Sequence, residues 1–227
     1  RLCRKYGALL ICDEVVSGFR IGMAGAQGYY GIDPDLTIFG KVIAGGYPGA
    51  GGVAGHKDVM KHLGAGLDSS GKKVKKAMCG GTMAATPISC VAGYTTLCEI
   101  EKRNACQTAG QMADRLVEGL QKSIDAHNLP FITYNIGSVC HLHTVATMQH
   151  QIEWTKLWKV PSVLDETGIR QKEMEHMGAA YMAEGLVTLA GCRLYTSAAY
   201  DEEKIDDVIS RFDKVFDKCG KIDRPKK

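Results

Sequence analysis

Residues 7–20 read GALLICDEVVSGFR, and residues 36–46 read LTIFGKVIAGG. The apolar run of the first stretch ends in Asp13, and that of the second ends in Gly40 and Lys41. Short apolar runs beside glycines are typical of buried strands. In open α/β sheets, ligands bind at the carboxyl ends of the strands. We therefore predict two neighbouring buried strands that bring a buried carboxylate and a buried amine to one place.

These two charged side chains have two interpretations. Asp13 and Lys41 could pair with each other, although a buried ion pair is a weak source of stability because both charges lose their water. Alternatively, each has a separate role on one cofactor. An amine forms a Schiff base with an aldehyde, and a fixed carboxylate keeps a pyridine nitrogen protonated. The second interpretation describes a pyridoxal phosphate site.

The runs LLICDEVVSGFR (residues 9–20) and GAQGYYGIDPDLTIFGKVIAGGYP (residues 25–48) resemble the cofactor-binding core of the class III aminotransferases, which are pyridoxal-phosphate-dependent enzymes of fold type I. The most similar branch is that of the glutamate-1-semialdehyde 2,1-aminomutases. The resemblance implies an α/β fold in which residues 1–100 form the C-terminal part of the large cofactor-binding domain. Residues 101–227 would form a small C-terminal α/β domain. The implied activity is amino-group transfer on a small amino acid or amino-aldehyde substrate.

The same resemblance assigns four residues to the cofactor, pyridoxal 5′-phosphate. Asp13 would hold the pyridine nitrogen, and Val15, which points the same way from the strand, would pack on a face of the ring. Lys41 would form the internal aldimine and, once released, carry a proton between the substrate carbon and the cofactor carbon. Thr82 falls where the family binds the phosphate of the neighbouring subunit's cofactor, which implies a homodimer.

Substrate choice depends on the segment LAGCRLYTSAAY, residues 189–200, which resembles the small-domain loop that borders the active site in this family. An aminomutase is expected to have a glutamate close to Cys192, and its absence here counts against a strict aminomutase. Arg193 could bind a substrate carboxylate with two parallel hydrogen bonds, or be an ordinary surface arginine. Aminotransferase, aminomutase and racemase or epimerase activities stay open, because each begins with the loss of one proton.

A function of a different class is also open. The chain begins at Arg1 with LCRKYGALL, which is typical of a helix end running into a strand, without a methionine or a leader. We therefore expect the C-terminal part of a longer soluble protein, which could be a noncatalytic module or one subunit of a split protein. Against that alternative, the four residues assigned to the cofactor all have the expected types.

Composition limits the partners and the compartment. A net charge of +3 is too small to indicate nucleic acid or a membrane as partner, and no apolar stretch has membrane-spanning length. The nine cysteines are odd in number and never spaced as Cys-X-X-Cys, so we predict no metal site and a reducing cytoplasm. Cys140, His141 and His143 form one metal-like cluster. The two histidines would share a face of a strand, but no second ligand group is near in sequence.

The remaining chain alternates helical and extended patterns. Apolar spacing predicts helices over residues 54–63, from Pro87 through Ile100, over 107–120, over 171–184 and over 201–218. Alternating patterns predict strands over residues 131–135, 138–147 and 186–189. Residues 148–168 are predicted to be irregular.

Overall fold

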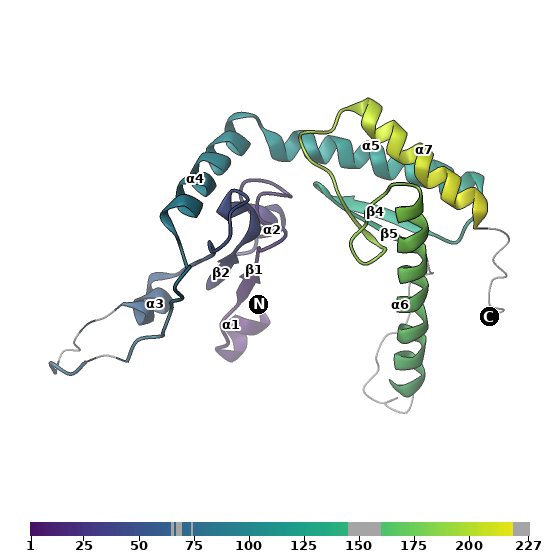
Figure 1. Cartoon of the computed structure of the whole chain (residues 1–227). Coiled ribbons are helices and arrows are strands. Elements are labelled where there is room, and N and C mark those ends of the chain that lie inside the picture. The colour runs from purple at the N-terminus through teal and green to yellow at the C-terminus, as the bar shows by residue number, and fades with distance from the viewer. Residues whose placement is uncertain (65, 67–69, 74, 145–159, 220–227) are drawn as a thin grey trace. The chain divides into compact units, whose positions relative to one another are not determined.

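The computed structural model describes residues 1–64, 66, 70–73, 75–144 and 160–219 (Figure 1). The chain divides into two compact units, Arg1–Gln107 and Thr108–Lys227. Each unit contains a three-stranded sheet together with helices. The predicted α/β class is therefore confirmed.

The sheet of the first unit has the strand order β1-β2-β3. β1 (Ile11–Asp13) runs parallel to β2 (Leu36–Phe39), and β3 (Gly52–Gly55) runs antiparallel to β2. Parallel strands cannot be joined by a tight hairpin, and here the crossover contains the short helix α2 (Gly25–Tyr30). The helix α1 (Leu2–Tyr6) precedes β1 and ends at a glycine with left-handed backbone.

After β2 the chain forms the 3-10 helix η1 (Lys41–Ala44), and after β3 it forms α3 (Lys57–Met60) and η2 (Lys61–Leu63). The helix predicted over residues 54–63 is thus wrong at its start, where the chain pairs with β2. Glycine permits this pairing, because a Cβ at Gly55 would lie 2.3 Å from the carbonyl oxygen of Asp35. The long helix α4 (Pro87–Lys102) begins at the predicted proline, whose missing N–H is not needed in a first turn.

The prediction that the first strand is buried is wrong. Leu9 and Ile11 are 55% and 51% exposed, and the side chains of Asp13 and Lys41 are exposed as well. An apolar run becomes buried only when other elements cover both faces of its sheet. No described element of this unit covers Leu9 and Ile11.

The second unit has the antiparallel strand order β4-β5-β6. Its strands are β4 (Ile132–Ile136), β5 (Val139–His143) and β6 (Arg193–Tyr195). Its helices are α5 (Ala105–Ala126), which starts just before the unit, α6 (Val160–Ala183) and α7 (Glu202–Lys218). Asp201 caps α7 by accepting a hydrogen bond from the Lys204 N–H at 2.9 Å, and acidic residues follow in the first turn, as the helix dipole favours.

The core of this unit lies between the sheet and its helices. All three helices and two of the strands contribute fully or nearly fully buried apolar side chains, among them Leu120, Leu142, Tyr181, Leu194 and Phe212. The rings of Tyr181 and Phe212 meet edge to face, with centroids 4.8 Å apart. The helices therefore cover the face of the sheet to which Cys140, Leu142 and Leu194 contribute.

The predictions for the second unit have mixed outcomes. The helices over 107–120 and 201–218 are confirmed, and the strands predicted over 131–135 and 138–147 correspond to β4 and β5, with residues 145–147 outside the described part. The prediction of an irregular segment is wrong for residues 160–168, which belong to α6. A proline is compatible with the first turn of a helix. Residues 148–159 lie outside the described part of the chain. The strand over 186–189 is also wrong, since Leu189 alone forms a bridge, to Arg193.

Candidate active site

The acid and the amine predicted from the sequence lie at the ends of two paired strands. Asp13 is the last residue of β1 and stands opposite Ile38 of β2, while the next backbone N–H donates to the Ile38 carbonyl at 2.9 Å. β2 ends at Phe39, and Lys41 begins η1 two residues later. The two strands are neighbours, as predicted, and they run parallel. The structure thus brings Asp13 and Lys41 to the same edge of the sheet.

Asp13 is oriented by its own chain. The backbone N–H of Val15 donates to Asp13 Oδ1 at 2.9 Å, which holds the carboxylate against the turn that follows β1. Val15 itself is half-buried beside the chain that leads to Lys41, because a Cβ on Gly40 would lie 3.2 Å from Val15 Cγ1. Val15 therefore binds Asp13 through its backbone and lies beside Gly40, the residue before Lys41.

Lys41 has a backbone conformation that L-residues avoid. Its φ is 51°, in the left-handed region, although lysine has a Cβ. Such a conformation costs about 1–3 kcal/mol and persists only where surrounding structure enforces it. Strained residues of this kind cluster at functional sites.

Two glycines allow η1 and α4 to pack closely against each other. A Cβ on Gly93 would lie 1.9 Å from the Ile43 carbonyl oxygen, and one on Gly45 would lie 2.4 Å from the Ala92 carbonyl carbon. Only glycines allow the two backbones to approach so closely. Sequence reasoning missed Gly93, because a single glycine inside a helix carries no indication of what packs against it.

The sequence prediction also missed the structural role of Glu14. It is 2% exposed and accepts hydrogen bonds from Ser17 Oγ, from the Ala26 N–H at 3.0 Å and from the Gln27 N–H at 2.7 Å. Burial alone would raise the pKa of Glu14, but these hydrogen bonds outweigh it and lower the pKa. The available signal was strand alternation, which turns Glu14 away from the face that Asp13 occupies.

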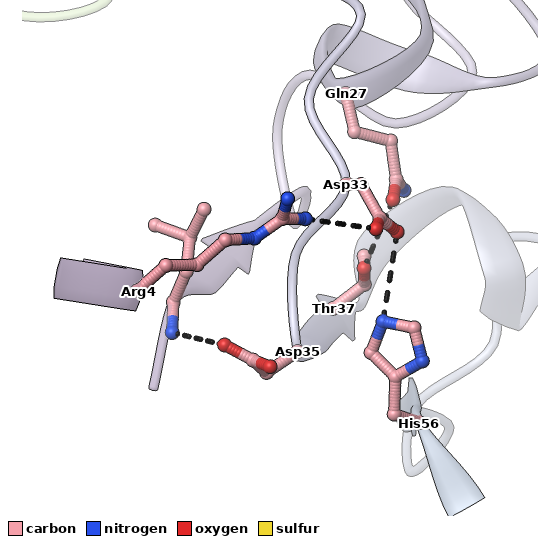
Figure 2. A network of polar contacts seen from close by, with 7 residues as sticks. Arg4, Gln27, Asp33, Asp35, Thr37 and His56 are labelled. Carbon is pink, nitrogen blue, oxygen red and sulfur yellow. Dashed lines mark hydrogen bonds and ion pairs between the residues drawn. The ribbon is translucent and has the colours of Figure 1, made fainter. Parts of the chain in front are cut away.

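Glu14 binds the backbone of α2, which is attached in turn to the sheet. Other hydrogen bonds and ion pairs lie at the opposite edge of the sheet. Thr37 Oγ1 donates to Gln27 Oε1 at 3.1 Å, so the start of α2 is attached to β2 (Figure 2). The Leu10 N–H donates to Asp35 Oδ2 at 2.7 Å, just before β1 and β2 begin. Figure 2 also shows Asp33 between Arg4 and His56. These contacts fix the strands at the edge away from Asp13 and Lys41.

Thr82 lies in an exposed turn, where the Ala84 N–H donates to the Gly81 carbonyl at 2.9 Å. This turn is attached to the segment that follows η1, since the Ala85 N–H donates to the Gly49 carbonyl at 2.6 Å. Buried Ser89 Oγ donates to the neighbouring Pro48 carbonyl at the same distance. No hydrogen bond joins Thr82 to Asp13 or Lys41 in the described chain.

Arg193 belongs to the second unit, whereas Asp13, Val15, Lys41 and Thr82 belong to the first. It is the exposed first residue of β6, and its backbone N–H donates to the Leu189 carbonyl at 3.0 Å. Arg193 is therefore not part of the group of residues that the first unit brings together.

Disulfides and clusters of metal-ligating side chains do not occur among the residues that the structure describes. All nine cysteines are free, and no group of three or more metal-ligating side chains occurs within the described ranges. None of the described helices is long and apolar enough to cross a membrane. Asp13 and Lys41 are not joined by an ion pair anywhere in the part of the chain that the structure describes.

Three solved structures share this fold. An omega-transaminase from Sphaerobacter thermophilus has 25% sequence identity and a TM-score of 0.71 over 95% of this chain and 45% of its own. A structure described as a transaminase with PLP bound has 23% identity and a TM-score of 0.74, over 95% and 45%. A β-phenylalanine aminotransferase from Variovorax paradoxus has 19% identity and a TM-score of 0.72, over 97% and 46%. The chain thus spans less than half the length of these proteins.

These likenesses establish the fold type I architecture predicted from the sequence. A family-wide sequence model described as "Aminotransferase class-III" matches residues 1–216. That match includes both units and almost the entire sequence. The chain therefore belongs to the class III aminotransferases, whose cofactor is pyridoxal 5′-phosphate.

Proposed function

We propose that this protein is a pyridoxal-phosphate-dependent aminotransferase in which Lys41 attaches the cofactor and Asp13 binds its pyridine nitrogen. One observation carries the proposal. An amine and a carboxylate lie at the same edge of the sheet without forming an ion pair with each other. Two opposite charges at adjacent strand ends that stay separate are available to hold two ends of a third molecule.

The residues present fit that cofactor. The Lys41 side chain is exposed, so its amine is accessible to an aldehyde. Asp13 Oδ1 accepts the Val15 N–H, whereas Asp13 Oδ2 receives no hydrogen bond from the described residues and can accept one from a protonated ring nitrogen. Val15 is half-buried beside Gly40, the residue before Lys41, and its methyl groups can contact the face of a flat ring.

Each side chain then has a distinct part in amino-group transfer. When bound, pyridoxal phosphate stabilises the negative charge that develops when the substrate carbon loses a proton. Asp13 keeps the ring nitrogen protonated, and Val15 restrains the ring plane. Lys41 Nζ accepts the proton from the substrate carbon and returns it to the reacting system, acting as a general base and then as a general acid.

The proposed quaternary structure depends on Thr82. We propose a homodimer in which Thr82 binds the phosphate of the cofactor in the neighbouring subunit. Its support is the exposed position of the Thr82 turn, together with the absence of hydrogen bonds to Asp13 and Lys41 in the described chain.

The proposed domains are residues 1–100 for the large-domain part and 101–227 for the small domain. The free cysteines support a reducing cytoplasm as the compartment.

For the substrate we propose a small amino acid or amino aldehyde whose carboxylate, when it has one, is bound by Arg193. Arg193 is exposed and forms no ion pair with the described residues, so its guanidinium is free to make two parallel hydrogen bonds to a carboxylate. Transfer to a separate carbonyl acceptor is expected. Product formation without any acceptor would indicate the intramolecular aminomutase reaction, and loss of optical activity alone would indicate racemisation.

The test is borohydride reduction of the complete subunit, comprising these residues and any sequence that precedes them, after loading with pyridoxal phosphate. Peptide mass spectrometry should find the pyridoxyl group on Lys41. A Lys41→Arg variant should lose the modification, while the control Lys57→Arg should keep it. Folded protein with Lys41 unmodified would overturn the proposal and favour a noncatalytic module.

A further inference from the structure

The turn that contains Thr82 is attached to the loop after η1 by two hydroxyl groups at the start of α4. Ser89 is fully buried, and its Oγ donates to the Pro48 carbonyl at 2.6 Å. The Thr86 hydroxyl lies 2.8 Å from Ser89 Oγ. Ser89 has a single hydroxyl proton, which it donates to Pro48, so Thr86 must be the donor in the second hydrogen bond. We name this chain of hydrogen bonds, from Thr86 through Ser89 to Pro48, the hydroxyl tether.

The backbone beside the hydroxyl tether is closely packed. The Ala85 N–H donates to the Gly49 carbonyl at 2.6 Å, and a Cβ on Gly49 would lie 2.2 Å from the Met83 carbonyl oxygen. Ala85 has a φ of 53°, a left-handed conformation that a residue with a Cβ adopts only where its surroundings enforce it. The Thr82 turn therefore has one specific position relative to the loop after η1.

The other end of the hydroxyl tether leads to the candidate cofactor site. The Tyr47 N–H donates to the carbonyl of Ala44, the last residue of η1, at 3.0 Å. Pro48 is the next residue, and η1 begins with Lys41. The segment proposed to bind an aldehyde and the turn proposed to bind a phosphate are thus joined through Ser89.

We propose that Ser89 is a positioning residue for phosphate binding, because the hydroxyl tether fixes the turn that presents Thr82 to the phosphate of pyridoxal phosphate. Ser89 has no exposed surface, so it acts through this turn and not by its own contact with a ligand. Donors that are already held in place bind an anion more tightly, since less conformational entropy is lost on binding. The inference rests on the proposed role of Thr82.

A buried serine also contributes to stability, and a purely structural Ser89 would affect every ligand of the site alike. Pyridoxal, which lacks the phosphate, distinguishes the two roles. It has the same aldehyde and ring nitrogen as pyridoxal phosphate, so it offers groups to Lys41 and Asp13 but none to Thr82. A positioning role therefore predicts a selective loss of affinity for pyridoxal phosphate.

Absorbance titrations of the complete subunit, freed of cofactor, with pyridoxal phosphate and with pyridoxal test this inference. Ser89→Ala should raise the dissociation constant of pyridoxal phosphate about fivefold, while that of pyridoxal stays within about twofold. The matched control is Ser123→Ala, which removes a buried hydroxyl and its hydrogen bond to Asp213 in the second unit. It should lower the stability to denaturant without changing either dissociation constant.

A double-mutant cycle provides a second measurement. Thr82→Ala should weaken the binding of pyridoxal phosphate by itself. In that background Ser89→Ala should have little further effect, because Ser89 acts through the Thr82 turn. Thr86→Val removes the other hydroxyl of the tether and should show the same preference, with a smaller loss for pyridoxal phosphate and none for pyridoxal.

Other results would overturn the inference. These are an unchanged affinity for pyridoxal phosphate in Ser89→Ala, an equal loss for both ligands, additive effects of Ser89→Ala and Thr82→Ala, or a Thr82→Ala variant with normal affinity. Borohydride trapping in the unmodified protein is measured separately. Trapping at Lys41 together with normal affinity in Ser89→Ala shows that only the positioning role is wrong, whereas folded protein without trapping at Lys41 shows that the proposed function is wrong.

Discussion

Gly93 of α4 touches the carbonyl of Ile43 so closely that a Cβ at residue 93 would lie 1.9 Å from that oxygen. Ile43 is in the same short helix as Lys41, whose backbone is left-handed. A residue far along the chain from the candidate site therefore packs against the short helix that begins with Lys41.

Gly93→Ala should displace η1 and lower cofactor affinity at least tenfold, while reducing the free energy of unfolding by about 1–3 kcal/mol through overpacking. Absorbance titration with pyridoxal phosphate and urea denaturation measure the two effects. The matched control is Gly168→Ala in α6, where nothing lies within 4 Å of the added Cβ. It should stabilise the protein by up to about 1 kcal/mol, because alanine is the better helix former. Normal affinity in Gly93→Ala would contradict the positioning role.

Lys41→Gly should separate stability from function. Both Lys41→Gly and Lys41→Ala remove the amine and should abolish cofactor attachment. Because φ is 51° at this position, the glycine variant should be more stable than the alanine variant, by about 1 kcal/mol in denaturant unfolding. The same pair of substitutions at Lys122 in α5 should give the opposite order, since glycine is unfavourable in a helix. If the alanine variant is more stable than the glycine variant at both positions, Lys41 is not strained.

Glu14→Gln should destabilise the first unit in a pH-dependent way. The variant replaces a buried acceptor of three hydrogen bonds, and we expect a loss of about 1–3 kcal/mol at pH 7. The folded-state pKa of Glu14 is lowered, so its contribution is complete above the unfolded-state pKa and disappears as the pH falls through the folded-state value. The difference from the unmodified protein should therefore shrink in acid.

Urea denaturation at several pH values measures this difference. The exposed Glu101 provides the control, and Glu101→Gln should change stability by less than about 0.5 kcal/mol at every pH. A Glu14→Gln effect that stays constant into acid would argue against a hydrogen-bonded carboxylate in the folded protein.

Tyr181→Phe should stabilise the second unit. Tyr181 is fully buried, and its hydroxyl has no hydrogen-bond partner among the described residues. Burial raises the pKa of this phenol, so it stays neutral and the effect should not depend on pH near neutrality. Removing an unpaired buried hydroxyl should add about 1 kcal/mol to the free energy of unfolding. Tyr94→Phe, at a side chain that is 72% exposed, should have no measurable effect. A less stable Tyr181→Phe would reveal an unseen partner.

Local signals were sufficient for much of the fold. β2, α4 and α7 follow from an apolar run, a proline at a first turn and an acidic cap with helical spacing. β3 could not be predicted, because Gly52 and Gly55 permit close pairing only when β2 is already in place. The start of α6 was misread because its proline is compatible with a first turn.

Part of the candidate site was likewise predictable from the sequence and part was not. Asp13 and Lys41 stand where residue type and strand ends predicted them, because β1 and β2 run parallel and end at the same edge of the sheet. Their exposure was not predictable from apolar runs, since burial depends on what covers the sheet. Glu14 and Gly93 act through contacts between residues distant in sequence, which no local pattern encodes.

The register of the second sheet also has a consequence for the order of folding. β4 and β5 form a hairpin around Gly137, and hairpins of this kind close in about 1–10 μs. β6 comes much later in the chain, so its pairing with β5 must overcome a far larger loop-closure entropy. Tyr134 and His141 can therefore pair early, whereas Arg193 joins them in the slowest step of assembling this sheet.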